Sequence, residues 1–467
     1  MISVKQRTLH EAIYDGSREA RNQGRPLLIS YIEKIEYIHP ITYFNNSGVA
    51  FNGQRFFWSS PDHHILVGAG FAATFEGQGP ERTQEIKAQW ERVLTHWAGS
   101  REEAGTGPVL VGGLSFDPAN PHVSRWSGFP EAGFSIPTFL LTQKKDNTWL
   151  TVNTWVEGTT DTDQLSAELI ARKNDLLKEQ PVDFYATSWI KQVNDLNTDA
   201  WKSSVKTATT KIANRELEKV VLAREVEIQG NTHFSLPSIL KSLADNQQMS
   251  YIFAFERGDK CFIGATPERL IERRGTTLYT GALAGTAARG RSQAEDRRLE
   301  NDLLRDTKNR GEHDFVVKMI CEAMANFTEE LTFPDRPEVL KVKDVQHLYT
   351  PISGRAKRQV SLLDIVEKLH PTPALGGQPR EKALELIQQL EDFNRGWYAS
   401  PIGWLDAEGY GEFAVAIRSA LIKDDRAWAY AGCGVVEASD PDEELEETHL
   451  KLRPMLAALG GGRNLDN

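Results

Sequence analysis

The carboxyl-terminal region of the chain contains strand-forming segments that only short turns separate. The segments WYASPIGWLD (397–406), GEFAVAIRSALI (411–422) and AWAYAGCGVV (427–436) are joined by AEGY and KDDR. Turns this short predict an antiparallel meander, because parallel strands need a crossover of about a dozen residues or more. Helical periodicity elsewhere lies between groups of strands without regular strand–helix alternation. The sequence therefore predicts an α+β fold, with antiparallel sheets in the core and helices outside.

The amino-terminal region is expected to be rich in β-strands. RPLLISYI, ITYFNN, VAFNGQRFFWSS and HHILVGAG are predicted strands, whereas TQEIKAQWERVLTHW and DQLSAELIARKNDLLKE have the apolar period of helices. No Pro/Gly/Ser-rich linker divides the chain. We predict one large two-lobed unit, in which residues 1–190 complete the fold of a catalytic region at residues 191–467.

The charge balance and the cysteines limit the function classes. With 54 basic and 65 acidic residues the net charge is -11, so no excess of positive charge indicates binding to nucleic acid or to an anionic membrane. The three cysteines show no CxxC pairing, the amino-terminal segment lacks the apolar run of a signal peptide, and no apolar stretch is long enough to span a bilayer. We expect a cytoplasmic, monomeric enzyme with a small-molecule substrate.

Lys219 begins the apolar segment KVVLAR, where strand alternation places it on one face with Val221 and Ala223. One interpretation is a lysine whose stem packs at the strand end while its ammonium group reaches water. The other is a general base, since a low-dielectric site disfavours the ammonium form. The residues alone leave both interpretations open.

Glu268 follows a predicted strand in CFIGATPERLIERR. Thr266 and Pro267 would cap a short helical turn, which would give the glutamate a purely local setting. If Glu268 faces an enclosed cavity instead, burial would raise its pKa and make it a general acid complementary to Lys219.

An acidic helix is predicted in GCGVVEASDPDEELEETHLKL, with a capping box that starts at Asp440 and Pro441. Glu444, Glu447 and Lys451 follow at i, i+3 and i+7, which places two carboxylates and an ammonium group on one helix face. Such a face is either a salt-bridged solvent surface, or a site where carboxylates hold Mg²⁺ and the lysine holds an anion.

A second candidate carboxylate lies in the amphipathic segment LLRDTKNRGEHDFVVKMICEAM. Glu312 precedes Val316 and Ile320 at helical spacing on the predicted inward stripe. His313 beside it does not make the HExxH pattern of a zinc site. The glycine-rich segments GALAGT and GCGVVE lack the spacing of phosphate- or dinucleotide-binding loops, so nucleotide binding is not predicted.

The ordered set of motifs resembles that of the chorismate-utilising enzymes over about residues 195–457. The motifs that carry the resemblance are KVVLAR, GATPERL, GALAGT, NRGEHDFVV, VQHL, HPTPALGG, RGWYASPIGW, FAVAIRSA and AGCGVVEASDPDEELEETHLKL. This family includes isochorismate synthase, anthranilate synthase component I, aminodeoxychorismate synthase and salicylate synthase.

The resemblance implies a Mg²⁺ site built by Glu312 and Glu447, with Glu444 in a supporting position and the metal on the ring carboxylate of the substrate chorismate. Asn309 departs from the pattern, because relatives often carry an acidic residue there. The substrate carboxylates and ring would be held by Tyr398, Arg418, Lys451, His347, Thr286 and the backbone at Gly432 and Gly434.

Four features distinguish among the family members and their forms. Lys219 stands where water-using members have lysine and anthranilate synthase has glutamine. Ala284 replaces the nucleophilic lysine of aminodeoxychorismate synthases, and HPTPALGG, with Ala374 and Leu375, is similar to isochorismate-forming members rather than to those that also eliminate pyruvate. The long amino-terminal region resembles the menaquinone-pathway form.

The resemblance thus implies an isomerase that forms isochorismate from chorismate. Lys219 would deprotonate a water that attacks C2, and Glu268 would protonate the C4 hydroxyl as it leaves. A salicylate synthase and a catalytically silent chorismate-binding protein are the alternatives.

Overall fold

The strands form one connected network that divides at β6 (Ala132–Lys144). The computed structural model describes residues 7–119, 124–179, 188–341, 345–358 and 360–460. One edge of β6 pairs with β3, while its other edge pairs with β5 through residues 132–135 and with β7 through residues 139–144. Two long arms and one short branch therefore leave this strand.

The first arm continues from β6 through seven strands, with two short strands beside the last. In order of pairing they are β3 (Ile65–Gly77), β2 (Arg55–Ser59), β10 (Tyr251–Arg257), β11 (Lys260–Thr266), β20 (Ser419–Lys423), β21 (Arg426–Val435) and β9 (Lys219–Gly230), with β8 (Ile190–Asp195) and β17 (Gly377–Gln378) on the outer edge of β9.

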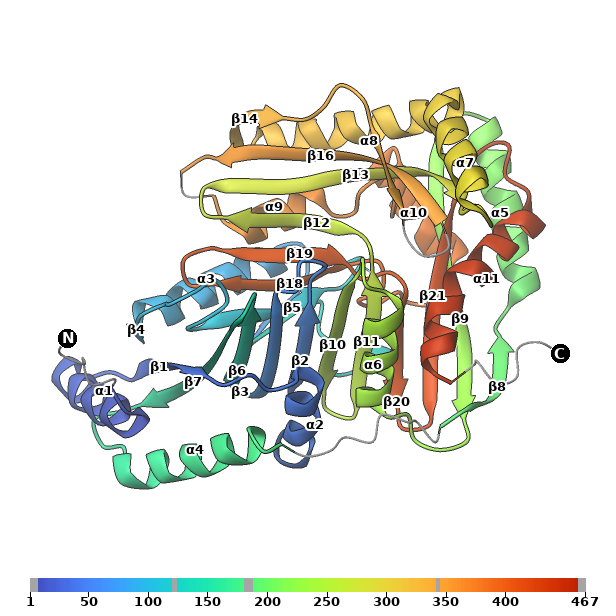
Figure 1. Cartoon of the computed structure of the whole chain (residues 1–467). Coiled ribbons are helices and arrows are strands. Elements are labelled where there is room, and N and C mark those ends of the chain that lie inside the picture. The colour runs from blue at the N-terminus through green and yellow to red at the C-terminus, as the bar shows by residue number, and fades with distance from the viewer. Residues whose placement is uncertain (1–6, 120–123, 180–187, 342–344, 359, 461–467) are drawn as a thin grey trace.

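The second arm leaves β6 through β5 and runs crosswise to the first in Figure 1. It contains β5 (Val109–Leu114), β18 (Pro401–Asp406), β19 (Gly411–Val415), β12 (Arg269–Arg274), β13 (Thr277–Ala288) and β16 (Val345–Ala356), with β14 (Thr328–Thr332) and β15 (Glu338–Lys341) on β16. The short branch contains β7 (Asn147–Val156), β1 (Leu27–Ile35) and β4 (Trp97–Gly99). All pairings except β1–β4 are antiparallel, which confirms the predicted fold class.

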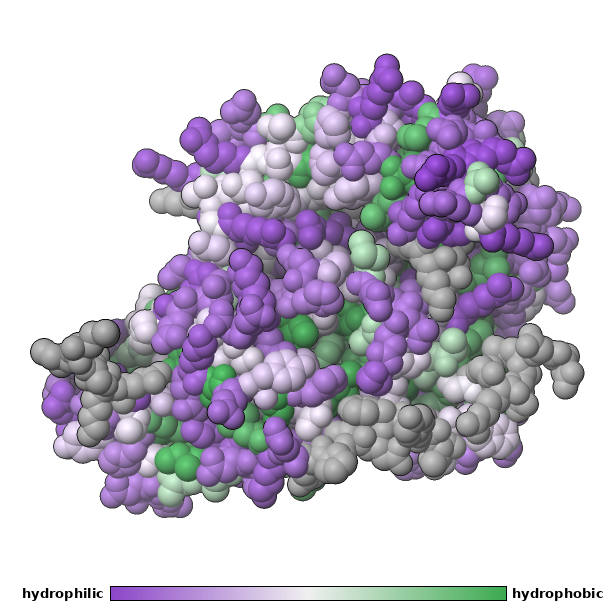
Figure 2. All heavy atoms as spheres, in the orientation of Figure 1, coloured by the Kyte–Doolittle hydropathy of each residue, from purple (hydrophilic) through white to green (hydrophobic). Residues whose placement is uncertain are grey.

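Helices cover the outer faces of this network. In Figure 1, α8 lies behind β13 and β16, and α11 lies beside β21. The helices are α1 (Leu9–Gln23), α2 (Pro40–Phe51), α3 (Arg82–Thr95), α4 (Thr162–Leu176), α5 (Thr198–Ala213), α6 (Leu236–Asn246), α7 (Gln293–Arg305), α8 (Thr307–Ala325), α9 (Leu362–Leu369), α10 (Arg380–Leu390) and α11 (Pro441–Ala458), with a 3₁₀ turn at Ser124–Trp126. Apolar side chains fill the space beneath them, and the face in Figure 2 is mostly hydrophilic.

The predicted carboxyl-terminal meander is interrupted where the two arms separate. GEFAVAIRSALI was expected as one strand, and this was wrong: it forms β19 and β20, which belong to different arms. The link between β11 and β12 lies against this break, since the Val415 amide donates to the Glu268 carbonyl at 3.0 Å and the Ala265 amide donates to the Arg418 carbonyl at 3.1 Å. The β11–β12 link and the β19–β20 break therefore lie side by side, and together they open a space between the two arms.

The predicted strand ITYFNN was also wrong, because it lies in α2. His39 caps this helix by accepting from the Ile41 amide, and Pro40 occupies its first turn. Proline is favoured there because its missing N–H needs no partner. The predicted helices at 83–97 and 163–179 are confirmed as α3 and α4, and the strand that the KVVLAR segment predicts from Lys219 is confirmed as β9.

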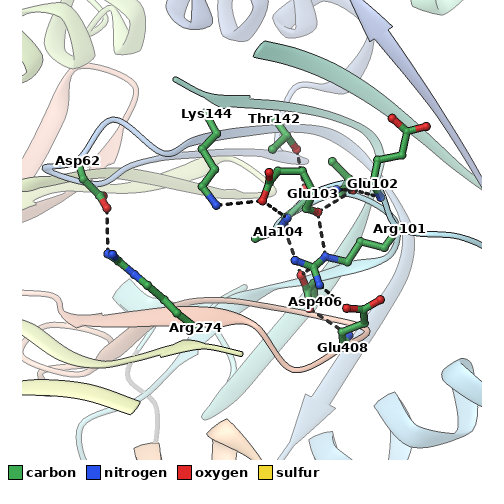
Figure 3. A network of polar contacts seen from close by, with 12 residues as sticks. Asp62, Arg101, Glu102, Glu103, Ala104, Thr142, Lys144, Arg274, Asp406 and Glu408 are labelled. Carbon is green, nitrogen blue, oxygen red and sulfur yellow. Dashed lines mark hydrogen bonds and ion pairs between the residues drawn. The ribbon is translucent and has the colours of Figure 1, made fainter. Parts of the chain in front are cut away.

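Ion pairs also join the parts of the network. Arg101 pairs with Asp406 at 3.2 Å and with Glu408 at the β18–β19 turn, while Asp62, from the β2–β3 turn, pairs with Arg274 of the second arm at 2.9 Å (Figure 3). Strands from both sides of residue 190 pair directly, as in β2–β10 and β5–β18. The division at residue 190 stays a prediction, and residues 180–187 lie outside the described residues. No helix among the described residues is long and apolar enough to cross a membrane.

Candidate active site

A cavity of about 320 Å³ lies where the two arms separate. Strands β9 and β21 form one wall, β13 and β16 form another, and α8 and α11 contribute charged side chains. Among the residues named from the sequence, its lining includes Lys219, Glu268, Thr286, Glu312, His347, Tyr398, Arg418, Gly432, Gly434, Glu447 and Lys451. The structure thus brings together every predicted site residue except Glu444.

Lys219 enters the cavity from the first position of β9. Its neighbour across the strand pair is β21, where a Cβ atom on Gly434 would lie 2.7 Å from the lysine Cε. The absence of a side chain at Gly434 therefore leaves room for the lysine. Lys219 Nζ donates to Glu312 Oε1 at 2.5 Å, and the two side chains are 17% and 38% exposed. The amine is thus largely buried and paired with a carboxylate, a partner that neither interpretation from the sequence included.

Glu268 lies in the link between β11 and β12 rather than in a helical turn. Thr266 still provides local support, because its hydroxyl accepts from the Glu268 amide at 3.2 Å. Burial raises the pKa of the Glu268 carboxyl to about 7, while the positive charges of Arg418 and Lys451 oppose the shift. A carboxyl group with this pKa can carry and deliver a proton near neutral pH.

Arg418 and Tyr398 occupy the irregular backbone beside the strand breaks. Arg418 has a φ of 53°, which the break between β19 and β20 imposes. Burial lowers the pKa of the guanidinium, and the nearby Tyr398 and Glu447 oppose this shift. Tyr398 stacks on Tyr430 with ring centroids 5.2 Å apart, and burial raises its pKa to about 12. The phenol is therefore a neutral donor beside a cation, an arrangement that suits a carboxylate ligand.

Thr286 on β13 and His347 on β16 are cross-strand neighbours in the second arm. The Thr286 hydroxyl lies 2.9 Å from His347 Nδ1, and a bulge at Gly285, with a φ of 75°, shifts the β13–β16 register beside them. Burial, followed by the charge of Arg418, lowers the pKa of His347 to about 4. The imidazole is therefore neutral at physiological pH and can accept or donate one hydrogen bond.

The acidic face of α11 is partly a salt-bridged surface and partly a cavity wall. Glu447 pairs with Lys451 at 2.5 Å, and Lys451 Nζ also donates to the Gly432 carbonyl at 2.8 Å. Glu444 does not line the cavity, because its Oε1 accepts from the Ser439 hydroxyl at 2.7 Å. Asp440 caps the helix, as predicted, by accepting from the amides of the next two non-proline residues.

Two of the three predicted metal-binding carboxylates face the cavity. Glu312 on α8 and Glu447 on α11 both line it, and each is paired with a lysine. In the part of the chain that the structure describes, no three His, Cys, Asp or Glu side chains gather closely enough to hold a metal ion. The donors nevertheless fit Mg²⁺, which usually binds through one or two carboxylates together with water and substrate oxygens.

Arg395 is a cavity residue that the sequence reasoning missed. It is 3% exposed and forms a bidentate ion pair with Glu391. The available signal was its place as the first residue of the motif RGWYASPIGW, three residues before Tyr398. Asn309, noted as a departure, also lines the cavity and donates to the Asp306 carboxylate at the start of α8.

Comparison with known proteins gives matches over nearly the whole chain. Residues 13–460 match the family described as chorismate binding enzyme. The chain is 42% identical to isochorismate synthase MenF of Bacillus subtilis, over 99% of this chain and 100% of that protein. It is 33% identical to the salicylate biosynthesis isochorismate synthase of Pseudomonas aeruginosa, over 95% and 93% of the two chains.

Solved structures show the same fold. The menaquinone-specific isochorismate synthase MenF of Escherichia coli superposes with a TM-score of 0.79 at 24% identity, over 97% of this chain and 100% of that chain. Anthranilate synthase component I of Streptococcus pneumoniae gives a TM-score of 0.72 at 21% identity, over 86% and 92% of the chains.

Proposed function

Because the chain belongs to the family of chorismate-binding enzymes, we propose that it is an isochorismate synthase, an isomerase that acts on chorismate. The observation that carries this proposal is that the Lys219 amine and the Glu268 carboxyl line the same cavity, where burial raises the pKa of the carboxyl to about 7. The relation to two isochorismate synthases at 42% and 33% identity supports it.

The cavity suits a small ring that carries two carboxylates. Its volume of about 320 Å³ lies near the lower end of the usual range for small-molecule sites. Arg418 and Lys451 supply positive charge, and Tyr398 supplies a neutral donor beside them. We assign these three groups to the substrate carboxylates, and Thr286 with neutral His347 to the ring and its hydroxyl groups.

The reaction exchanges one hydroxyl for another across the ring. An incoming water must lose a proton as its oxygen bonds to C2, the ring double bonds shift, and the C4 hydroxyl must gain a proton to leave as water. We assign the first transfer to Lys219 and the second to Glu268. Holding both groups against one bound ring supplies orientation as well as proton transfer.

Glu312 and Glu447 are our proposed Mg²⁺ ligands. Bound there, Mg²⁺ would neutralise and orient the ring carboxylate of the substrate. Glu444 would support the metal site from outside the cavity, because it lies on α11 one turn before Glu447. We further propose a cytoplasmic enzyme of menaquinone biosynthesis, which the full-length relation to isochorismate synthase MenF of Bacillus subtilis supports.

The test is a product analysis with purified protein, chorismate and Mg²⁺. We expect isochorismate, loss of activity on chelation, and recovery when Mg²⁺ is returned. Release of pyruvate would instead indicate salicylate formation. Binding of chorismate without any product would indicate the silent binding protein and would contradict the proposal.

A further inference from the structure

The outer edge of β9 has a gap that side chains bridge instead of a strand. β17 pairs with Lys219 and Val220 only, and β8 pairs with β9 from Val226 onward. The Val221 amide still donates to the Gly376 carbonyl at 2.9 Å. The Val221 carbonyl and both backbone groups of Ala223 need other partners, because unpaired buried amides and carbonyls are costly. This gap lies at the cavity wall, since both residues line the cavity.

Arg395 and Glu391 fill part of this gap. Arg395 Nη2 donates to the Val221 carbonyl at 2.7 Å, and the Ala223 amide donates to Glu391 Oε1 at 2.7 Å. The Trp201 indole donates to the Ala223 carbonyl at 3.1 Å. The ion pair thus takes the place of a neighbouring strand for the part of β9 that follows Lys219.

The same ion pair reaches two other walls. Arg395 Nη1 donates to the Leu375 carbonyl at 3.2 Å, and Leu375 lines the cavity from the segment after α9. Arg395 is also three residues from Tyr398, whose backbone amide donates to the Arg395 carbonyl at 2.9 Å. Most of the guanidinium N–H groups of Arg395 therefore donate to protein acceptors. Arg395 thus differs from Arg418 and Lys451, which we assign to the substrate carboxylates.

We propose that the Glu391–Arg395 ion pair is a positioning unit for the reaction. It fixes the edge of β9 that presents Lys219, and it holds this edge in register with the segments that carry Leu375 and Tyr398. The inference rests on the proposed function, because it assigns a role to Lys219 and Tyr398 in that chemistry. Only a guanidinium can serve all these acceptors in one plane, whereas a lysine has one donor centre.

The test compares Arg395→Lys with a matched pair elsewhere in the fold. Arg55 and Glu256 form a second buried bidentate pair, at 2.5 and 2.6 Å, in which the arginine also donates to a backbone carbonyl and the glutamate also accepts from a backbone amide. Both pairs lie against a phenylalanine ring, but Arg55 does not line the substrate cavity. Arg55→Lys is therefore the control for loss of a buried ion pair alone.

We expect both lysine variants to melt at a lower temperature than the parent protein. Below its melting temperature, Arg395→Lys should lower kcat at least about 10-fold with KM changed less than about threefold, because misplacement of a catalytic group slows the chemical step. Arg55→Lys should keep the parent kcat. Glu391→Gln should repeat the loss in kcat, and it carries the test if the Arg395 variant does not fold.

A double variant measures whether the two residues act as one unit. Arg395→Lys with Glu391→Gln should have a kcat within about threefold of the slower single variant. An unchanged kcat in folded Arg395→Lys, an equal loss in Arg55→Lys, or a rise in KM alone would overturn the inference. If the parent protein itself does not convert chorismate, the proposed function fails instead, so the two failures are distinguishable.

Discussion

At the scale of single residues, the carboxyl group of Glu268, our proposed general acid, links the proposed reaction to the stability of the fold. Its pKa is raised from 4.5 to about 7 by burial, against the opposing charges of Arg418 and Lys451. The folded chain therefore binds this proton more tightly than the unfolded chain does. The carboxyl costs no stability below its unfolded pKa of 4.5, and the free energy of unfolding falls as the pH rises from there to about 7.

Glu268→Gln should therefore stabilise the protein at high pH while it slows turnover. The amide does not ionise, so the variant is expected to exceed the parent protein by up to about 3 kcal/mol in unfolding free energy at about pH 8, and to match it at about pH 4. Removal of a general acid should lower kcat about 100-fold or more. Denaturant unfolding at both pH values checks the first effect, and a stability difference independent of pH would contradict it.

Lys219 has two possible roles that one substitution separates. In this structure it is the ion-pair partner of Glu312 at 2.5 Å. Lys219→Arg retains a cation for that carboxylate, but a guanidinium is not deprotonated in proteins and cannot act as a base. We expect the arginine variant to fold with nearly the parent melting temperature and to lose at least about 100-fold in kcat. Substantial turnover by this variant would mean that Lys219 has only a structural role.

At the scale of helices and strands, the sequence predicted the strand that presents Lys219 but not the break that presents Arg418. β9 has apolar residues at alternate positions, among them Val220, Val226 and Ile228, and it ends at a glycine, so its period of two predicts a strand. GEFAVAIRSALI is equally apolar on both sides of Arg418, and local pattern does not reveal that its halves pair with different strands. The break depends on long-range pairing with β11 and β12, which a single segment does not encode.

Substitution of Gly434 on β21 tests whether the space at this glycine positions the Lys219 side chain of β9. A methyl group there would lie 2.7 Å from Lys219 Cε and 3.2 Å from Nζ, so Gly434→Ala must displace the lysine side chain. We expect kcat to fall about 10-fold or more, while the melting temperature changes little because a flexible side chain can move. Gly48→Ala is the control. A methyl group there would lie 2.9 Å from Arg55 Nη1, and this contact lies away from the cavity. Equal kcat values for the two variants would contradict this assignment.

At the scale of the whole molecule, the cavity exists because two sheet arms diverge from one strand. Motif order predicted site residues that, with the exception of Glu444, all line it, since each motif keeps its own local spacing. The exceptions have physical reasons. Glu444 shares a helix face with Glu447, but Ser439 holds its carboxylate outside the cavity. Arg395 was missed because its role depends on backbone groups of β9 and of Leu375, which lie far from it in the sequence.

Residues 1–190 supply strands to both arms, so residues 191–467 should not be active alone. In a fragment of residues 191–467, β10 would lose its pairing with β2, and β18 would lose its pairing with β5. Exposed strand edges promote association, so we expect this fragment to aggregate and to lack turnover. Refolding it together with residues 1–190 should restore activity, because the Arg55–Glu256 pair and both strand pairings can form again. Circular dichroism and chorismate turnover check both expectations, and a soluble, active fragment would show that residues 1–190 are dispensable for the site.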